Sequence, residues 1–102
     1  MNRKTSEGKK ILDDSTKYEL LELPLARRQL NRLRATHHSL VKAIVEAIKN
    51  LAAAPRPPRA EKLVGREEWR IRMGDYRVLY LIDDRNRSIT ITKVAHRRDV
   101  YR

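Results

Sequence analysis

The chain has 102 residues, a length that fits one domain with a single hydrophobic core. It has no cysteine, which excludes disulfides and thiolate zinc sites, and its three histidines make a poor ligand set, so we expect no metal and no cofactor. Its net charge of +11 indicates a polyanionic partner, which leaves nucleic acid, the ribosome, an acidic protein and an anionic membrane all open. No apolar run matches a membrane span or a signal peptide, which predicts a soluble cytoplasmic protein.

The beginning of the chain predicts a tail and then a strand. Residues 1–16 are mostly charged or small and polar, so we expect a flexible N-terminal tail, with the folded domain at 17–102. Residues 17–23 are dense in apolar side chains and stop at Pro24, which suits the first turn of a helix. A short strand that leads into a helix is therefore expected.

Two helices follow, each marked by apolar residues at helical spacing. The second has Ser39 as its expected N-cap and a continuous apolar stripe that ends at Ala52. The prolines that begin at Pro55 cannot continue a helix, so a stiff basic connection is expected up to Gly65. Four arginines cover the outer face of the first helix with no acid among them: Arg27, Arg28, Arg32 and Arg34.

Three strands are expected in the last third of the chain. Trp69, Ile71 and Met73 alternate with Arg70 and Arg72, the period of a half-buried strand that aims two arginines at its open face. The next strand is apolar at both parities from residue 78 onward, as expected of a central strand covered on both faces. The predicted strands, separated by turns, cover residues 67–73, 76–82 and 88–95.

These elements predict an α+β fold. Its order is a strand, two helices and then a three-stranded antiparallel meander, with the helices packed on one face of the sheet. The opposite face is then the expected working surface. Arg70, Arg72 and the last seven residues, HRRDVYR, can converge there, because side chains of adjacent strands alternate between the two faces.

Residues 17–102 resemble the RelE toxins of type II toxin–antitoxin systems, in the wider RelE/ParE superfamily. The resemblance rests on four stretches in this order: PRPP, KLVG, WRIRMGDYRVLYLIDD and ITITKVAHRRDVYR. The resemblance implies a ribosome-dependent endoribonuclease, an mRNA interferase that enters the A site and cuts mRNA there. It also implies a cognate acidic antitoxin, RelB-like, with operator DNA bound only by the toxin–antitoxin complex, and no membrane.

The same resemblance implies roles for individual residues. Arg77 and Arg97 align with arginines credited with stabilising the phosphate, and Tyr101 with a tyrosine that stacks on or orients the substrate nucleotide. Arg70 and Arg72 align with a basic pair that is lysine in the best-known members. Without a metal, such a site needs a base for the 2′-hydroxyl, cations for the charge on phosphorus and a donor for the leaving oxygen.

The general base is left open by this pattern, because arginine, with its pKa above 12, is a poor base. His96 stands where relatives often have a basic residue, and we expect it to act in acid–base catalysis. The expected catalytic set is therefore Arg72, Arg77, His96, Arg97 and Tyr101. The expected substrate-binding set is Arg27, Arg28, Arg70, Arg98 and Arg102.

Simpler interpretations stand beside these. Arg70 and Arg72 fit an ordinary solvated strand face, and Arg77 fits either an ion pair with Asp75 or Asp99 or a site for phosphate. Tyr76, Tyr80 and Trp69 fit the core. Two other functions stay open for the chain. A ParE-like poison of DNA gyrase would share the fold, and a non-catalytic basic module would regulate its own operator together with an antitoxin.

Overall fold

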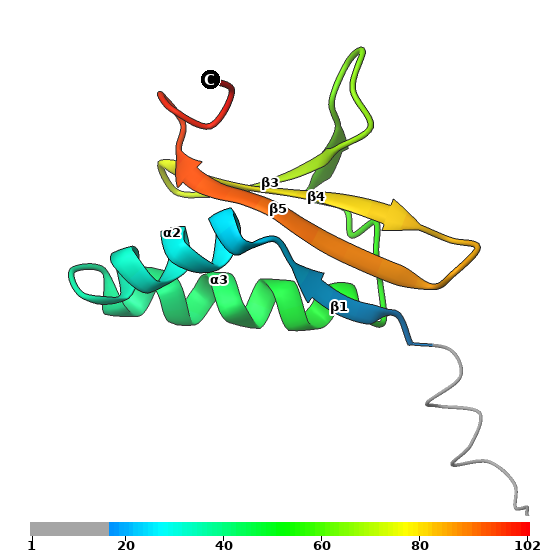
Figure 1. The fold of residues 1–102 in the computed structure, drawn as a ribbon, viewed down its shortest axis with the longest axis horizontal. Coiled ribbons are helices and arrows are strands. Elements are labelled where there is room, and N and C mark those ends of the chain that lie inside the picture. The colour runs from blue at the N-terminus through cyan, green and yellow to red at the C-terminus, as the bar shows by residue number, and fades with distance from the viewer. Residues whose placement is uncertain (1–16) are drawn as a thin grey trace, which may run out of the picture.

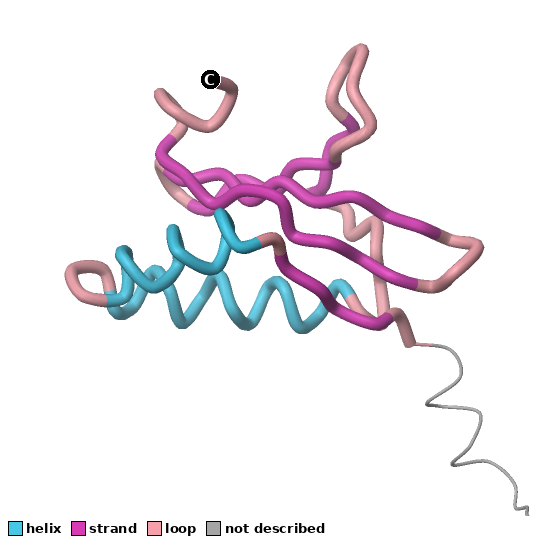
Figure 2. The backbone as a smooth tube through the Cα atoms, in the orientation of Figure 1, coloured by secondary structure: helices cyan, strands magenta, loops and turns pink. Residues whose placement is uncertain are grey.

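Two helices cover one face of a five-stranded sheet, as Figure 1 shows. The computed structural model describes residues 17–102, so the tail expected at 1–16 lies outside the described residues. The strands lie in the order β1-β5-β4-β3-β2, and two loop-bearing segments, the β2–β3 hairpin and the C-terminal turn, rise from the face away from the helices (Figures 1 and 2). The α+β prediction is confirmed.

The helices are α2 (Pro24–Arg34) and α3 (His38–Leu51). Pro24 occupies the first helical position, where its missing N–H costs nothing, after Leu23 in an extended conformation. The N-cap of α3 is His37, so the expectation of Ser39 as cap is wrong. Ser39 is already helical, and the non-helical φ of −133° falls at His37, whose ring nitrogen bonds the Thr36 hydroxyl at 2.8 Å. Among residues 17–102, neither helix is long and apolar enough to span a membrane.

The predicted meander is formed by β3 (Trp69–Met73), β4 (Tyr76–Asp83) and β5 (Ser88–His96), each paired antiparallel with the next. The edge strand β1 (Glu19–Glu22) runs parallel to β5, so the sheet is mixed. The strand β2 (Ala60–Lys62), which pairs with β3, was not predicted and lies inside the segment expected to be an irregular connection. Three residues of the sequence AEK carry no strand pattern, and only the partner strand defines them.

The main core lies between the helices and the sheet. Tyr80 is fully buried there and its hydroxyl donates to the Pro55 carbonyl at 2.8 Å, which confirms it as a core residue, and Trp69 packs against the edge of the same cluster. The other buried members come from every layer of the fold: Ala26, Leu30, Val41, Ile44, Leu51, Ile71, Met73, Val78, Ile89, Ile91 and Val94.

A bulge in β5 sets which side chains reach the open face. Tyr80 pairs with Ile91 but Leu79 pairs with Lys93, so Thr92 is an extra residue and the alternation shifts by one. Strict alternation from Ile91 would bury Lys93 beside the helices. The bulge instead sends Val94 into the core and places Lys93 on the face away from the helices.

Candidate functional site

The face of the sheet opposite the helices carries two rows of side chains, because residues paired across antiparallel strands share a face. One row crosses four strands and consists of Glu61, Arg70, Leu79 and Lys93. The second row, one pleat along, consists of Arg72, Arg77 and Ala95. The predicted working surface is thus built from β2, β3, β4 and β5, and we call Arg70, Arg72 and Arg77 the arginine face.

Arg77 is half-buried and directly opposite Arg72 in the β3–β4 ladder. Its guanidinium donates to the carbonyls of Gly74 at 2.8 Å and Tyr76 at 2.9 Å, and no carboxylate within residues 17–102 pairs with it. Like charges directly across a ladder destabilise it, and the local carbonyls fix the guanidinium without neutralising it. The arrangement is suited to an external anion.

Arg70 joins three segments of the chain. It donates to the Tyr101 hydroxyl at 2.6 Å and to Glu61, which also lies 3.8 Å from the Arg72 guanidinium. The hydrogen bond from Arg70, followed by the nearby charge of Arg72, holds the pKa of Glu61 below its usual range, so this carboxyl is ionised at neutral pH. Glu61 was not among the predicted site residues, because it lies on β2, a strand that the sequence pattern does not indicate.

The C-terminal turn is anchored over this face by an apolar contact. Val100 is fully buried in a small second cluster with Leu63 and Leu79, which explains why β4 is apolar at both parities. Lys93 adds a polar anchor, because its ammonium donates to the Arg102 carbonyl at 2.8 Å. These contacts hold Tyr101 beside Arg70 although its side chain is 45% exposed.

Arg97 and His96, adjacent in sequence, take different positions. The Arg97 amide donates to the Asp75 carbonyl at 2.7 Å, which extends the β4–β5 ladder by one residue and directs Arg97 to the side of Arg77. Its guanidinium lies 3.6 Å from the Asp75 carboxylate. His96 pairs with Tyr76 on the helix side of the sheet, with ring centroids 5.4 Å apart. The structure therefore does not bring His96 together with the arginine face.

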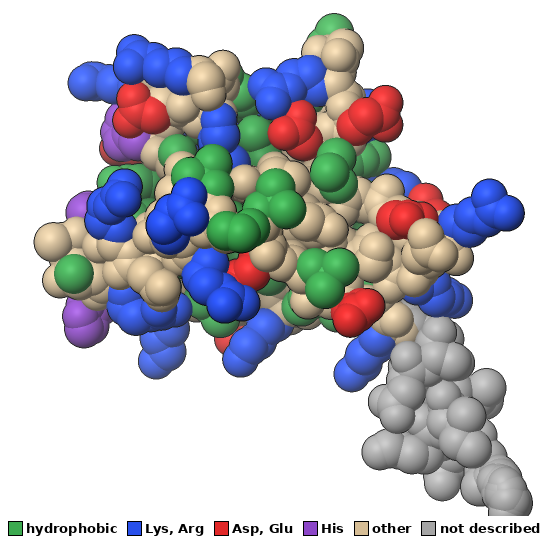
Figure 3. All heavy atoms as spheres, viewed as in Figure 1, with side chains coloured by type: hydrophobic (Ala, Val, Ile, Leu, Met, Phe, Trp, Pro, Cys, Tyr) green, Lys and Arg blue, Asp and Glu red, His purple; other side chains and the backbone are tan. Residues whose placement is uncertain are grey.

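The remaining expected binding residues are dispersed. Arg27 lies on α2, on the helix side, and pairs with Glu22 at 2.7 Å, while Arg28 is exposed on the same helix. Arg98 and Arg102 are exposed on the C-terminal turn, and Arg102 lies 3.4 Å from Asp99. Figure 3 shows the resulting spread of basic side chains over both the helices and the raised C-terminal turn.

The residues present suit phosphate chemistry more than metal chemistry. Within residues 17–102 no group of three or more His, Asp or Glu side chains is arranged to hold a metal ion. The open face instead offers guanidinium groups, the ionised carboxylate of Glu61 and the phenol of Tyr101. Those are the groups that a metal-independent transfer at phosphorus requires: cations, a proton acceptor and a hydroxyl donor.

Comparison with known proteins finds toxins of type II toxin–antitoxin systems. The family described as ParE toxin of type II toxin–antitoxin system, parDE, matches residues 23–101. Toxin RelG of Mycobacterium tuberculosis is 34% identical over 86 residues, which cover 78% of this chain and 99% of RelG.

Solved structures agree in fold. The toxin–antitoxin complex RelBE2 of M. tuberculosis contains a chain that is 29% identical, with a TM-score of 0.67 over 78% of this chain and 98% of that one. A chain of the archaeal RelE–RelB complex from Pyrococcus horikoshii OT3 is 23% identical, with a TM-score of 0.69 over 82% of this chain and 99% of that one.

Proposed function

Because the chain belongs to the ParE toxin family of type II toxin–antitoxin systems, within the RelE/ParE superfamily, we propose that it is a ribosome-dependent endoribonuclease that cleaves mRNA in the A site. The observation that carries the proposal is the arginine face. Arg72 and Arg77 oppose each other, no carboxylate within residues 17–102 pairs with Arg77, and Arg70 on the same face binds Glu61 and Tyr101. A bridging phosphate would turn this unfavourable charge pair into a binding site.

In the proposed reaction the 2′-hydroxyl of the nucleotide attacks the adjacent phosphorus, the bond to the 5′-oxygen breaks, and a 2′,3′-cyclic phosphate forms. Arg77 and Arg97 stabilise the charge that develops on the phosphoryl oxygens, and Arg72 assists from the opposite strand. Arginine is suited to this role because its planar fork matches two phosphate oxygens.

Glu61 is the proposed acceptor of the 2′-hydroxyl proton. It is the carboxylate on the arginine face, and its lowered pKa keeps it in the ionised form that a base requires. A bound phosphate competes for Arg70 and Arg72 and so restores the basicity of Glu61. Tyr101 is the proposed donor to the leaving oxygen, because Arg70 donates to its oxygen and leaves the phenolic proton available.

Ribosome dependence follows from the openness of the site. The arginine face lies on the surface of a sheet, so it attracts any RNA strand electrostatically but does not align one for in-line attack. Purified protein should therefore cleave mRNA held on ribosomes and cut the same RNA hardly at all when it is free. Equal rates with and without ribosomes would contradict the proposal.

A second candidate function has its own support, because the matching family is that of ParE toxins. A ParE-like chain would poison DNA gyrase and cut no RNA. Induction of this chain alone, followed by mapping of mRNA 5′ ends and a gyrase supercoiling assay, separates the two. Cuts within codons support the ribonuclease, gyrase-dependent DNA damage supports the second candidate, and the absence of toxicity supports a non-catalytic module.

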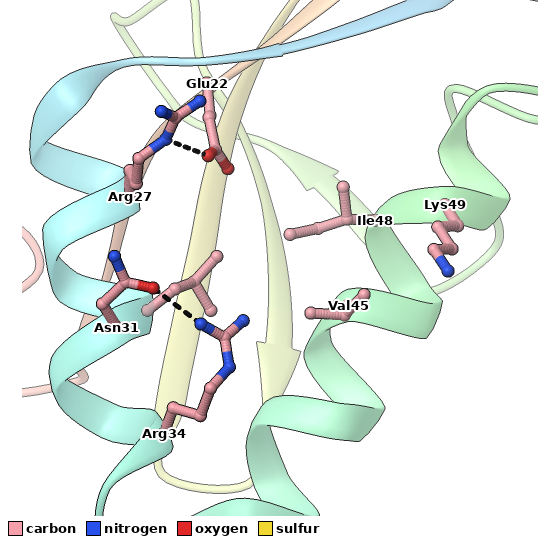
Figure 4. A pocket seen from close by; sticks show the side chains of 8 residues that line it. Glu22, Arg27, Asn31, Arg34, Val45, Ile48 and Lys49 are labelled. Atoms are coloured by element: carbon pink, nitrogen blue, oxygen red, sulfur yellow. Dashed lines mark hydrogen bonds and ion pairs between the residues drawn. The ribbon is translucent and has the colours of Figure 1, made fainter.

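The partner is proposed to be an acidic antitoxin that covers the arginine face, as a segment with carboxylates matched to a net charge of +11. The helix layer offers a second contact. A hollow of about 140 Å³ lies between β1, α2 and α3, with Leu30, Val45 and Ile48 as its apolar lining (Figure 4). Basic side chains at its margin, Arg34 and Lys49, favour an acidic amphipathic segment.

Charge reversal tests this contact without disturbing the core. Lys49→Glu should weaken the antitoxin complex, and Arg28→Glu, which makes the same change on α2 away from the hollow, serves as the control. Equal effects of the two variants would contradict docking at the hollow. A neutral or basic partner that leaves Arg77 uncovered would contradict the acidic antitoxin.

A further inference from the structure

A second hollow lies on the helix side of the sheet, at the end nearest the C-terminal turn. It has a volume of about 340 Å³, and its apolar part is formed by Leu33 and Val94. Tyr76 and His96 line it with aromatic rings that meet edge to face at 5.4 Å. The hollow thus combines an apolar floor with two rings, the combination on which unpaired nucleobases stack in RNA-binding proteins.

Polar groups enter this hollow from opposite sides. Arg32 enters from α2, and its guanidinium forms no ion pair within residues 17–102. Asp99 enters from the C-terminal turn, 61% exposed, with the Arg102 guanidinium 3.4 Å away. Gln29 uses its side-chain oxygen to accept from the Val94 amide at 2.7 Å, which fixes the side chain and leaves its NH₂ group for another acceptor.

The hollow is one residue away from the phosphate-binding groups on two strands. Tyr76 precedes Arg77 in β4, and His96 precedes Arg97 at the end of β5. Successive residues of a strand point to opposite faces, so each pair has one member in the hollow and one on the arginine side. The sheet ends here at the β3–β4 turn of Gly74 and Asp75, so the two faces meet beside these residues.

We propose that this hollow binds the base of a nucleotide next to the scissile phosphate and selects guanine, an inference that rests on the proposed ribonuclease function. Guanine has acceptors at O6 and N7 that match the guanidinium of Arg32. Its N1–H and 2-amino donors match the carboxylate of Asp99. The rings of Tyr76 and His96 supply the stacking surface, so His96 acts on the base and not on the 2′-hydroxyl.

Equilibrium binding of short RNAs to the full chain tests this selection. The probes are trinucleotides with uridine on both sides of guanosine, inosine, 7-deazaguanosine or adenosine, with 2′-O-methyl groups that block cleavage. Guanosine should bind about tenfold more tightly than adenosine, as one matched set of base-edge hydrogen bonds provides. Asp99→Asn should abolish the difference between guanosine and inosine, which lacks the 2-amino group, and Arg32→Gln the difference between guanosine and 7-deazaguanosine.

Arg28→Gln is the matched control, because it removes the same charge from the same helix outside the hollow. It should weaken all four probes equally and leave their ratios unchanged. Equal binding of the four probes to the wild-type chain, or unchanged ratios in Asp99→Asn, would overturn the base site. The assay needs neither ribosome nor cleavage, so guanosine preference in a chain that cuts no mRNA would contradict only the ribonuclease.

Discussion

Two clusters that contain arginine, at opposite ends of the sheet, differ in how the arginine charge is balanced. At the end formed by the β4–β5 turn, Arg56 binds Asp84 through two hydrogen bonds of 2.7 and 3.3 Å. Asp84 also accepts from the Tyr18 hydroxyl at 2.6 Å, and Arg56 lies over the Trp69 ring, 5.4 Å from its centroid. This cluster connects the segment before β1, the proline-rich connection and the turn.

The arginine face has the opposite balance. Arg70 and Arg72 share one carboxylate, Glu61, whereas Arg77 binds only backbone carbonyls within residues 17–102. The same residue type therefore stabilises the fold where a carboxylate and a ring complete its contacts. It leaves binding capacity for a ligand where they do not. We expect substitutions in the first cluster to change stability and those on the arginine face to change activity.

The largest effect is expected from Glu61→Gln, which keeps the shape of the side chain and removes the proton acceptor. Single-turnover cleavage of ribosome-bound mRNA should fall by roughly 10²-fold or more, in the range of a lost general base. Because the pKa of Glu61 is already lowered, the wild-type rate should be flat between about pH 6 and 8. A wild-type rate that varies in this window and is flattened by His96→Ala would support the acid–base role predicted for His96 instead.

Tyr80→Phe tests a residue that is expected to affect stability and not activity. Burial raises the pKa of Tyr80 to about 12, whereas an unfolded tyrosine ionises near 10. From pH 10 to 12 the unfolded chain therefore binds fewer protons than the folded one, and the free energy of unfolding falls by about 2 kcal/mol across this range. Urea unfolding should show this loss in the wild type relative to Tyr80→Phe, with full stability retained below pH 10. Parallel pH profiles would contradict the assignment.

The arrangement of the core was predictable because it rests on periodicity. The alternation of Trp69, Ile71 and Met73 and the helical stripe that ends near Leu51 depend on local sequence and hydrophobic burial alone. The position of Arg70 and Arg72 on the open face followed from the same alternation.

Features of the site that depend on tertiary pairing were not predictable. The strand β2 exists only by pairing with β3, so Glu61 could not be placed beside Arg70 from a sequence of three polar or small residues. The bulge at Thr92 redirects Lys93, and no residue pattern marks it. The resemblance placed His96 in the catalytic set with Arg97, and the strand pairing that puts His96 on the helix side of the sheet is a tertiary feature.

The smallest effect is expected at Arg98, which is exposed and lies outside both clusters. Arg98→Ala should change the cleavage rate little and reduce the salt dependence of ribosome binding by about one phosphate contact. The slope of log affinity against log salt concentration measures this. A loss of cleavage in Arg98→Ala with a nearly silent Arg97→Ala would move the site by one residue along the C-terminal turn.

The difference between the Arg56 cluster and the arginine face is tested most directly by two variants, Arg77→Ala and Arg56→Ala. For both variants, single-turnover cleavage on ribosomes and urea unfolding are measured in parallel. Arg77→Ala should lower cleavage by about 10²-fold or more and leave stability nearly unchanged, as loss of one preorganised donor to the transition state predicts. Arg56→Ala should keep the cleavage rate and lose about 1 kcal/mol of unfolding free energy through its contact with Trp69. Full cleavage by Arg77→Ala would contradict the arginine face as the catalytic site.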